Sequence, residues 1–149
     1  MLRIALISDT HGLLRPEAVA FLAGSDHILH AGDIGGPEIL AQLATLAPLS
    51  AVRGNNDDAP WAADLPLSLT VRLGGVAVHM VHDIADFRPA DAGTGDTGEA
   101  GVRVVVSGHS HKPAIAEREG VLFINPGSAG PRRFTLPISV AELRIEDGR

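Results

Sequence analysis

The sequence contains no cysteine, and this absence restricts its chemistry. Disulfide bonds, zinc–thiolate sites and thiol nucleophiles are excluded, so any bound metal ion has to be held by nitrogen and oxygen ligands. Aromatic residues are also scarce, with four phenylalanines and one tryptophan. So few rings cannot form a base-stacking platform for single-stranded nucleic acid.

Basic residues are outnumbered, and the formal net charge is −6 at pH 7. We therefore do not expect a surface that binds a nucleic-acid polymer through basic patches. No apolar stretch approaches the ~20 residues of a membrane span, and residues 2–7 are too short and lack the basic flank of a signal peptide. These absences predict a cytoplasmic protein that acts away from membranes on a small substrate. The composition is compatible with a homo-oligomer.

The first 57 residues alternate between strand and helix patterns. An apolar, β-branched run ends at Ile7. Pro16 suits the first turn of a helix that Gly24 ends, and apolar residues recur at helical spacing from Ile39 to Leu46. The predicted elements are strands ending at residue 7 and over 27–31 and 50–53, and helices over 16–23 and 37–46. This β-α-β-α-β order predicts parallel strands with right-handed crossovers.

After Trp61 the pattern changes to short strands. Residues 69–73 and 76–81 are joined through Gly74-Gly75, which is a hairpin signal. Residues 86–101 have the length of a crossover helix, but their four glycines predict a frayed helix or a surface loop. An apolar strand follows over 102–106, and the runs 113–117, 121–125 and 138–145 are predicted to be antiparallel strands of a second sheet.

Linkers, repeats and charge runs are missing from the chain, so we expect residues 1–149 to form a single domain. The fold class is predicted to be α/β. Its architecture should be a sandwich of two mixed parallel and antiparallel sheets with flanking helices.

Metal-competent side chains follow the predicted strands, at the points where ligands bind in open α/β sheets. Asp9 and His11 come directly after the first strand, and positions two apart face the same side of an extended chain. Alone, this pair is explained equally well by a helix N-cap followed by a surface histidine. The other strand ends complete the set, which is Asp9, His11, Asp33, Asn55, His82, His109 and His111.

Two carboxylates, four imidazoles and one amide are too many ligands for one ion. They suit two ions that share a bridging carboxylate. Imidazole and carboxylate together favour Mn²⁺, Fe, Zn²⁺ or Ni²⁺ over Mg²⁺. Two such ions roughly 4 Å apart can clamp the attacking and leaving oxygens of a displacement reaction and acidify a bridging water. Their charge would make the pocket positive inside an acidic protein.

In their order along the chain these residues resemble the motifs of the calcineurin-like metallophosphoesterases, and more narrowly the small bacterial and archaeal phosphodiesterases of that superfamily. The resemblance covers nearly the whole chain. It rests on Asp9-Thr10-His11, Gly32-Asp33, Gly54-Asn55-Asn56-Asp57, His82 and Gly108-His109-Ser110-His111, together with the turn Asn125-Pro126-Gly127-Ser128.

The resemblance implies the calcineurin-like metallophosphoesterase fold with a dinuclear site at one edge. Carried over by position, Asp9, His11 and His111 would hold the first ion. The second ion would be held by Asn55, His82 and His109, and Asp33 would bridge the two. Manganese is the ion expected first, with nickel, zinc or iron as alternatives.

Three positions depart from the family pattern. Better-equipped members have histidine where this chain has Asn56, which can donate a hydrogen bond but cannot transfer a proton at pH 7. Asn56 is therefore a catalytic candidate that favours diesters over monoesters. Asp83 follows His82 where glycine is usual, so it either adds an acidic group beside the ligands or crowds the site. Ser110 replaces a common threonine, with no effect expected.

The other histidines have simpler explanations. His30, inside the second strand, is expected to satisfy a buried hydrogen bond. His79 is three residues from His82, so it should face the other side of its strand and pack or lie at the surface. His27 is expected to be solvated.

Two further features have a functional and a plain interpretation. Arg132 and Arg133 could reach a substrate phosphate, or they could form a surface loop. Trp61 follows a proline and is expected to pack rather than to stack on a substrate.

The pattern as a whole predicts a hydrolase, a metal-dependent phosphoesterase that acts on phosphodiesters. A hydroxide bridging the two ions would attack phosphorus in line, while the ions and Asn56 stabilise the developing charge. The alternative is a non-catalytic, metal-binding interaction scaffold, resembling the retromer subunit of the same fold. Scaffolds tend to lose ligands, whereas all seven are present here, which favours the enzyme. A mononuclear oxygenase with two histidines and one carboxylate would leave most of these residues unexplained.

Overall fold

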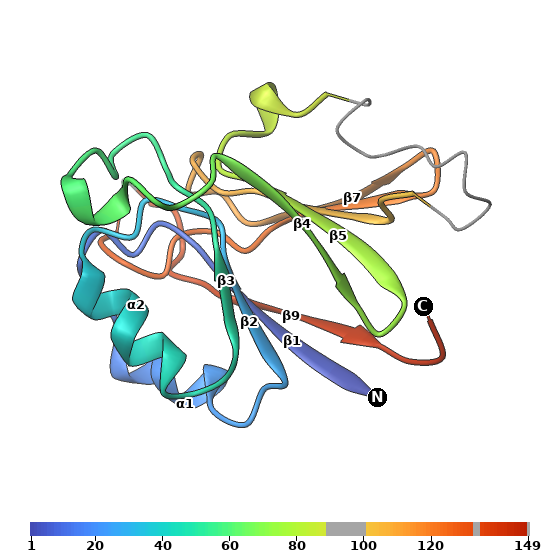
Figure 1. The fold of residues 1–149 in the computed structure, drawn as a ribbon, viewed down its shortest axis with the longest axis horizontal. Coiled ribbons are helices and arrows are strands. Elements are labelled where there is room, and N and C mark those ends of the chain that lie inside the picture. The colour runs from blue at the N-terminus through green and yellow to red at the C-terminus, as the bar shows by residue number, and fades with distance from the viewer. Residues whose placement is uncertain (89–100, 133–134, 149) are drawn as a thin grey trace.

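The chain forms two β-sheets that pack face to face, with helices outside one of them (Figure 1). The structure is a computed structural model and describes residues 1–88, 101–132 and 135–148. The first sheet has the order β3–β2–β1–β9, and the second has the order β4–β5–β6–β8–β7.

The bounds of the elements are as follows. The first sheet contains β1 (Leu2–Ile7), β2 (His27–His30), β3 (Leu49–Ala51) and β9 (Ala141–Ile145). The second sheet contains β4 (Ser68–Leu73), β5 (Val76–Val81), β6 (Val104–Val106), β7 (Ala114–Arg118) and β8 (Val121–Asn125). The helices are α1 (Pro16–Leu22) and α2 (Pro37–Ala44), with 3₁₀ turns η1 (Pro60–Ala62) and η2 (Ile84–Asp86).

Strand β1 is buried on both faces, which explains its apolar run. Ile4 and Leu6 pack in the cluster between the two sheets, whereas Ala5 and Ile7 pack in the cluster beneath the helices. All four side chains are fully buried. Burial of each large aliphatic side chain contributes about 1.5–3 kcal/mol, so β1 ties both layers of the fold together.

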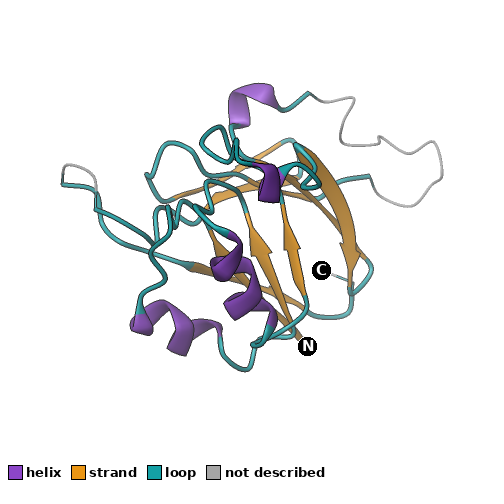
Figure 2. Ribbon diagram, turned by 60° about the vertical axis from the view of Figure 1, so that its left-hand side comes forward, coloured by secondary structure: helices purple, strands orange, loops and turns teal. Residues whose placement is uncertain are grey.

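The helices α1 and α2 cover the outer face of the first sheet (Figure 2). Each begins with a proline, Pro16 or Pro37, at a position where the missing N–H costs no helical hydrogen bond. Leu22 of α1 and Leu43 of α2 are fully buried against the sheet. The predicted sandwich with flanking helices is therefore confirmed.

The strand directions bring five loops to one edge of the sandwich. Strands β1, β2 and β3 are parallel to one another, and so are β5, β6 and β8. The segments that follow β1, β2, β3, β5 and β6 contain the candidate ligands. The loops that carry the site are thus held by strands of both sheets.

The prediction that the last three strands are antiparallel strands of a second sheet is confirmed for β7 and β8, which pair antiparallel there, but it is wrong for β9. Strand β9 belongs to the first sheet, where it pairs antiparallel with β1 from Leu2↔Ile145 to Leu6↔Ala141. Strand β8 runs parallel to β6, and β7 pairs antiparallel with β8. Strand β1 pairs with β2 along one edge and leaves its other edge open. After β8 the chain returns to the first sheet, and β9 pairs with that open edge of β1. Strand propensity does not specify which partner a strand takes.

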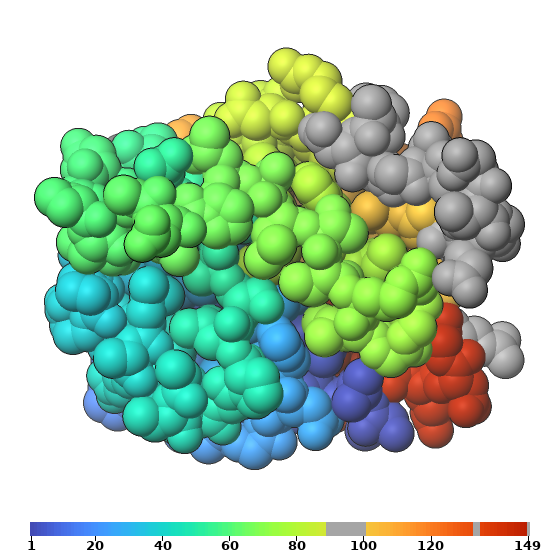
Figure 3. Space-filling model, viewed as in Figure 1, coloured from blue at the N-terminus to red at the C-terminus, as the bar shows by residue number. Residues whose placement is uncertain are grey.

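The opposite end of the sandwich is closed by the predicted β4–β5 hairpin. A Cβ at its turn residue Gly74 would come within 2.9 Å of the side chains of Leu2 and Ile145. In the space-filling view the hairpin lies beside the first and last strands (Figure 3). Within the predicted loop 86–101, residues 89–100 lie outside the described residues. None of the helices in the described part of the chain is long and apolar enough to cross a membrane.

Candidate metal centre

The structure brings all seven predicted ligands together at the edge where the five loops meet. Six of them form two groups, and within each group one donor atom from each residue lies within 4.8 Å of the others. The first group is Asp9, His11 and His111, and the second is Asp33, His82 and His109. The seventh residue, Asn55, places its Oδ1 3.1 Å from Nδ1 of His109. The first group has the same members as the first ligand set that the resemblance implied, and the second group combines two members of the second set with Asp33, the implied bridge.

Asp9 is the centre of the first group. Its side chain is fully buried, and its Oδ1 lies 3.5 Å from Nε2 of His111 and 3.9 Å from Nε2 of His11. The rings of His11 and His111 stack with their centroids 5.3 Å apart. No hydrogen bond from the described residues reaches Oδ1 of Asp9. A buried carboxylate oxygen facing imidazole nitrogens without a hydrogen bond fits a divalent cation between them.

Asp33 lies between the two groups. Its Oδ2 is 3.2 Å from Nε2 of His82 in its own group and 3.6 Å from Nε2 of His11 in the other. The backbone N–H of Asn56 donates to its Oδ1 at 2.9 Å, and the side-chain amide of Asn56 donates to its Oδ2 at 3.1 Å. Asp33 is therefore in position to serve both groups at once.

The electrostatics of the two carboxylates differ. Burial raises the pKa of Asp9, and the hydrogen bond from Ser8 and the nearby histidines only partly oppose this. Burial also acts on Asp33, but hydrogen bonds from His82 and the backbone of Asn56 dominate and lower its pKa to about 2. Asp33 is thus ionised throughout the neutral range, ready to bind a cation.

The backbone at the site is unusual. Among the described residues, seven non-glycine residues have a positive φ, and five of them are predicted ligands: Asp9 (56°), His11 (45°), Asp33 (55°), His109 (70°) and His111 (62°). Such conformations cost of order 1 kcal/mol each and concentrate at functional sites. They also correct one argument from the sequence. Asp9 and His11 converge because both are left-handed, and not because the chain is extended there.

Two glycines allow the ligand loops to approach the carboxylates. A Cβ at Gly54 would lie 2.2 Å from the backbone nitrogen and Oδ1 of Asp33. A Cβ at Gly108 would lie 2.0 Å from Oγ of Ser8 and 2.6 Å from Oδ2 of Asp9. Each glycine directly precedes a predicted ligand, so the absence of a side chain sets the distance between loops.

Two residues that support the ligand loops were not predicted from the sequence. Asp57 was recognised only as part of a motif, and Ser8 was given no role. The buried carboxylate of Asp57 accepts backbone N–H bonds from Ile34 (2.9 Å), Gly35 (3.2 Å) and Gly54 (3.0 Å), and so joins the loops after β2 and β3. The hydroxyl of Ser8 donates to Oδ2 of Asp9 at 2.7 Å. A carboxylate at the end of the turn Gly54-Asn55-Asn56-Asp57 is the signal that could have revealed Asp57, because aspartate side chains commonly accept backbone N–H bonds in turns.

The remaining histidines are not members of the ligand groups. His30 is buried and bonded at both ring nitrogens, to Thr10 Oγ1 and to the N–H of Gly32, as predicted. His79 is buried, and its Nδ1 lies 2.8 Å from the Thr70 hydroxyl, which confirms packing. His27 is half-buried and pairs with the Ser50 hydroxyl, so its ring is only partly solvated, less than expected.

The other features that the sequence left open are resolved in part. Trp61 packs against the cluster beneath the helices, as expected. Arg132 is exposed and donates to the carbonyl of Leu136, while Arg133 lies outside the described residues. Asp83 stands beside His109, with its Oδ2 3.6 Å from the Nε2 of that ring.

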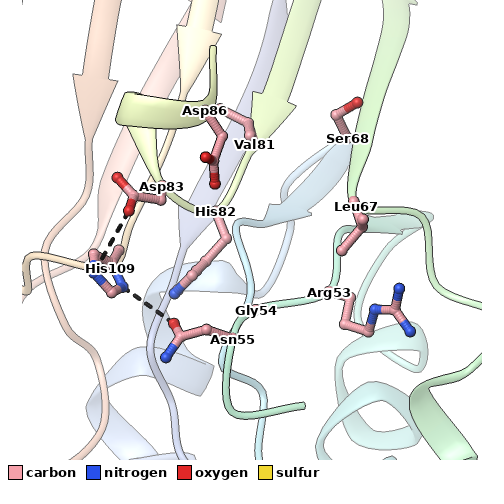
Figure 4. Close-up of a pocket in the computed structure, with 10 residues that line it drawn as sticks. All are labelled: Arg53, Gly54, Asn55, Leu67, Ser68, Val81, His82, Asp83, Asp86 and His109. Carbon is pink, nitrogen blue, oxygen red and sulfur yellow. Dashed lines mark hydrogen bonds and ion pairs between the residues drawn. The ribbon is translucent and has the colours of Figure 1, made fainter. Parts of the chain in front are cut away.

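A cavity of about 430 Å³ opens beside the second group (Figure 4). Its lining includes the predicted ligands Asn55, His82 and His109. Its other lining residues include the apolar side chains of Leu67 and Val81, the cation of Arg53, and the carboxylates of Asp83 and Asp86. The site therefore has room for an organic group next to the metal-binding residues.

Comparison with known proteins agrees with this geometry. Residues 2–148 match the calcineurin-like phosphoesterase superfamily domain. A probable metallophosphoesterase of Methanothermobacter thermautotrophicus is 40% identical, over 96% of this chain and 86% of that protein. Among solved structures, a predicted phosphoesterase of Streptococcus pneumoniae superposes with a TM-score of 0.70 at 26% identity (98% and 84% of the two chains). Vps29 of Chaetomium thermophilum superposes with a TM-score of 0.80 at 23% identity (97% and 82%).

The match extends over almost the entire described structure, and the family is metal-dependent, in agreement with the two ligand groups. The chain therefore belongs to the calcineurin-like phosphoesterase superfamily, and it is a metal-dependent phosphoesterase by its family.

Proposed function

We propose that this phosphoesterase hydrolyses phosphodiesters at a centre of two divalent metal ions. One observation carries the proposal: Asp33 lies within 3.6 Å of imidazole nitrogens from both ligand groups, so one carboxylate can serve two ions. The proposed ligands are Asp9, His11 and His111 for one ion and Asn55, His82 and His109 for the other. When bound, two such ions acidify a shared water and stabilise the charge that develops on phosphate.

The donor set narrows the choice of metal. Four imidazoles, two carboxylates and an amide suit divalent first-row transition-metal ions better than Mg²⁺, which prefers oxygen ligands and retains waters. We propose Mn²⁺ first, with Zn²⁺, Fe and Ni²⁺ as alternatives. The ionised Asp33 and the buried Asp9 supply the negative charge that holds the two ions, whichever of these metals is bound.

We assign Asn56 the role of a hydrogen-bond donor to the substrate. Its side-chain nitrogen carries two hydrogens, and one of them is donated to Oδ2 of Asp33 at 3.1 Å. The second hydrogen is directed away from that bond and can be donated to a phosphate oxygen at the same edge. Since an amide does not release a proton at neutral pH, Asn56 stabilises charge but does not protonate a leaving group.

The surroundings of the site support a diester as substrate. A diester has a second organic arm, and the cavity beside His82 and His109 has the volume to hold one. Its rim also carries the carboxylates of Asp83 and Asp86, which repel the second negative charge of a monoester more than the single charge of a diester.

The alternative of an interaction scaffold is less well supported. The Vps29 structures share the fold at under 25% identity, so they carry no functional assignment to this chain. The ligand groups here are complete and converge on buried carboxylates. A surface used for binding alone has no need of five left-handed ligand residues.

A substrate panel tests the proposal. The protein would be reconstituted with Mn²⁺ and assayed against bis(p-nitrophenyl) phosphate, p-nitrophenyl phosphate and cyclic nucleotides. We expect a higher kcat/KM for the activated diester than for the monoester. Asp9→Asn should remove this activity, while Asp64→Asn, at an exposed position outside the ligand groups and the cavity lining, should retain it. Equal or better hydrolysis of the monoester would contradict the diester assignment.

A further inference from the structure

Asp83 has both of its carboxylate oxygens placed by neighbours. Oδ1 accepts the backbone N–H of Ala85 at 3.0 Å and so caps the turn η2. Oδ2 points toward the ring of His109 and lies 3.6 Å from its Nε2. Because the cap fixes one oxygen, the carboxylate presents the other to His109.

The two nitrogens of His109 face opposite neighbours. Nε2 faces Asp83, and Nδ1 faces the side chain of Asn55, whose Oδ1 is 3.1 Å away (Figure 4). An ionised carboxylate only accepts hydrogen bonds. Beside Asp83 the single proton of a neutral ring therefore belongs on Nε2, which leaves the lone pair on Nδ1.

With that proton placement, Nδ1 of His109 and Oδ1 of Asn55 are two acceptors that face each other. Two lone pairs at 3.1 Å repel one another, so a cation between them or beside both stabilises the arrangement, whereas in metal-free protein the Asn55 amide can turn its NH₂ group toward Nδ1. Both residues are proposed ligands of the same ion. The position of Asp83 thus agrees with ligation through Nδ1.

We propose that Asp83 is a positioning residue: it holds the proton of His109 on Nε2 and turns Nδ1, with Asn55, toward the second metal ion. The inference rests on the proposed dinuclear site. The distance of 3.6 Å is longer than a hydrogen bond, but rotation of two partly exposed side chains can close the remaining few tenths of an ångström. Carboxylates that orient metal-binding histidines in this way strengthen the site.

This placement decides between the two roles that the sequence left open for Asp83. Asp83 lies on the side of His109 opposite Asn55 (Figure 4), and His82 meets the His109 ring at an edge-on centroid distance of 5.2 Å. The carboxylate is behind the ligand and does not crowd the space between the ligands.

The decisive variant is Asp83→Asn, which has nearly the same shape. Its side-chain oxygen keeps the capping bond to Ala85, so its NH₂ group faces His109 in place of Oδ2. A donor at that position favours the tautomer with the proton on Nδ1, which blocks the ligand atom. Asp83→Ala removes the partner without replacing it, and Asp86→Ala removes an equal charge from the same turn without touching His109.

Two measurements test the proposal. The first is the ¹⁵N spectrum of the imidazoles in metal-free protein at a pH where His109 carries one proton, with the resonances assigned through His109→Gln. We expect Nε2–H in the wild type and a shift of population toward Nδ1–H in Asp83→Asn. The second is calorimetric titration with Zn²⁺. We expect the second equivalent to bind about 10- to 100-fold more weakly in Asp83→Asn and Asp83→Ala, and within about threefold of wild type in Asp86→Ala.

The positioning role of Asp83 and the dinuclear site can be refuted independently of each other. If Asp83→Asn leaves both the His109 spectrum and the second-site affinity within about threefold of wild type, Asp83 does not position the ligand. If the wild-type protein binds a single Zn²⁺, the dinuclear function is wrong, and the metal-free spectra still decide whether Asp83 sets the tautomer of His109.

Discussion

His30 should make the stability of the protein sensitive to acid. The ring lies at the end of β2 and is fully buried. The N–H of Gly32 donates to its Nδ1 at 3.0 Å, so the ring proton is on Nε2 and is donated to the hydroxyl of Thr10, also at 3.0 Å. That hydroxyl in turn donates to the carbonyl of Ile34 at 2.8 Å. A second proton on the ring would face the N–H of Gly32 and break this chain.

The size of the effect follows from the pKa. Burial, reinforced by His82, lowers the pKa of His30 to about 3, compared with about 6.5 in an unfolded chain. Below pH 6.5 the unfolded state therefore binds a proton that the folded state does not. Stability from this group is complete above pH 6.5 and falls by about 1.4 kcal/mol per pH unit as the pH decreases toward 3. At pH 5 the loss is about 2 kcal/mol.

The assay is urea unfolding of metal-free protein at pH 7, 6 and 5, with His30→Gln as the perturbed protein. The variant should be less stable at pH 7, because a buried hydrogen-bond network is disturbed. The free energy of unfolding of the variant should nevertheless decline less steeply as the pH falls. The reason is that unfolding of the variant takes up about one proton fewer than unfolding of the wild type. His27→Gln is the matched control, since that ring is only half-buried and should change the slope less. Equal slopes for His30→Gln and wild type would refute the reasoning.

Two further predictions concern the loop after β3. Gly54→Ala places a Cβ 2.2 Å from Asp33, about 1.2 Å short of ordinary contact, so both Zn²⁺ sites should weaken. The control is Gly36→Ala, whose Cβ has the movable carboxylate of Glu38 as its nearest neighbour, and it should bind Zn²⁺ at both sites as the wild type does in the same calorimetric titration. Unchanged Zn²⁺ binding by Gly54→Ala would count against a shared Asp33. Asn56→His should raise kcat/KM about 10²-fold for esters with poor leaving groups and change activated esters little. The check is the slope of log kcat/KM against leaving-group pKa, and equal slopes for the two proteins would place Asn56 outside the proton-donor position.

The sequence predicted which side chains come together better than it predicted the last part of the fold. Asp33, His82 and the pair His109 and His111 were found because each follows a strand, and parallel strands deliver their carboxyl ends to one edge. That argument depends on strand direction alone. It therefore tolerates errors of one or two residues in the strand boundaries.

Features that depend on contacts between distant segments were out of reach. The pairing of β9 with β1 joins residues more than 130 positions apart, and no local pattern specifies it. The role of Asp57 appears only when the loops after β2 and β3 are adjacent. Left-handed backbone at Asp9 and His11 could not be anticipated either, because these residue types adopt it only where the surrounding structure holds them.

The central claim is that Asp33 serves two metal ions. Elemental analysis of the reconstituted protein, after removal of free metal, tests it most directly. We expect close to two equivalents of metal per wild-type chain and a loss from both sites in Asp33→Asn, to below one equivalent in total. A wild-type content of one equivalent or none, or an Asp33→Asn variant that retains two, would contradict it.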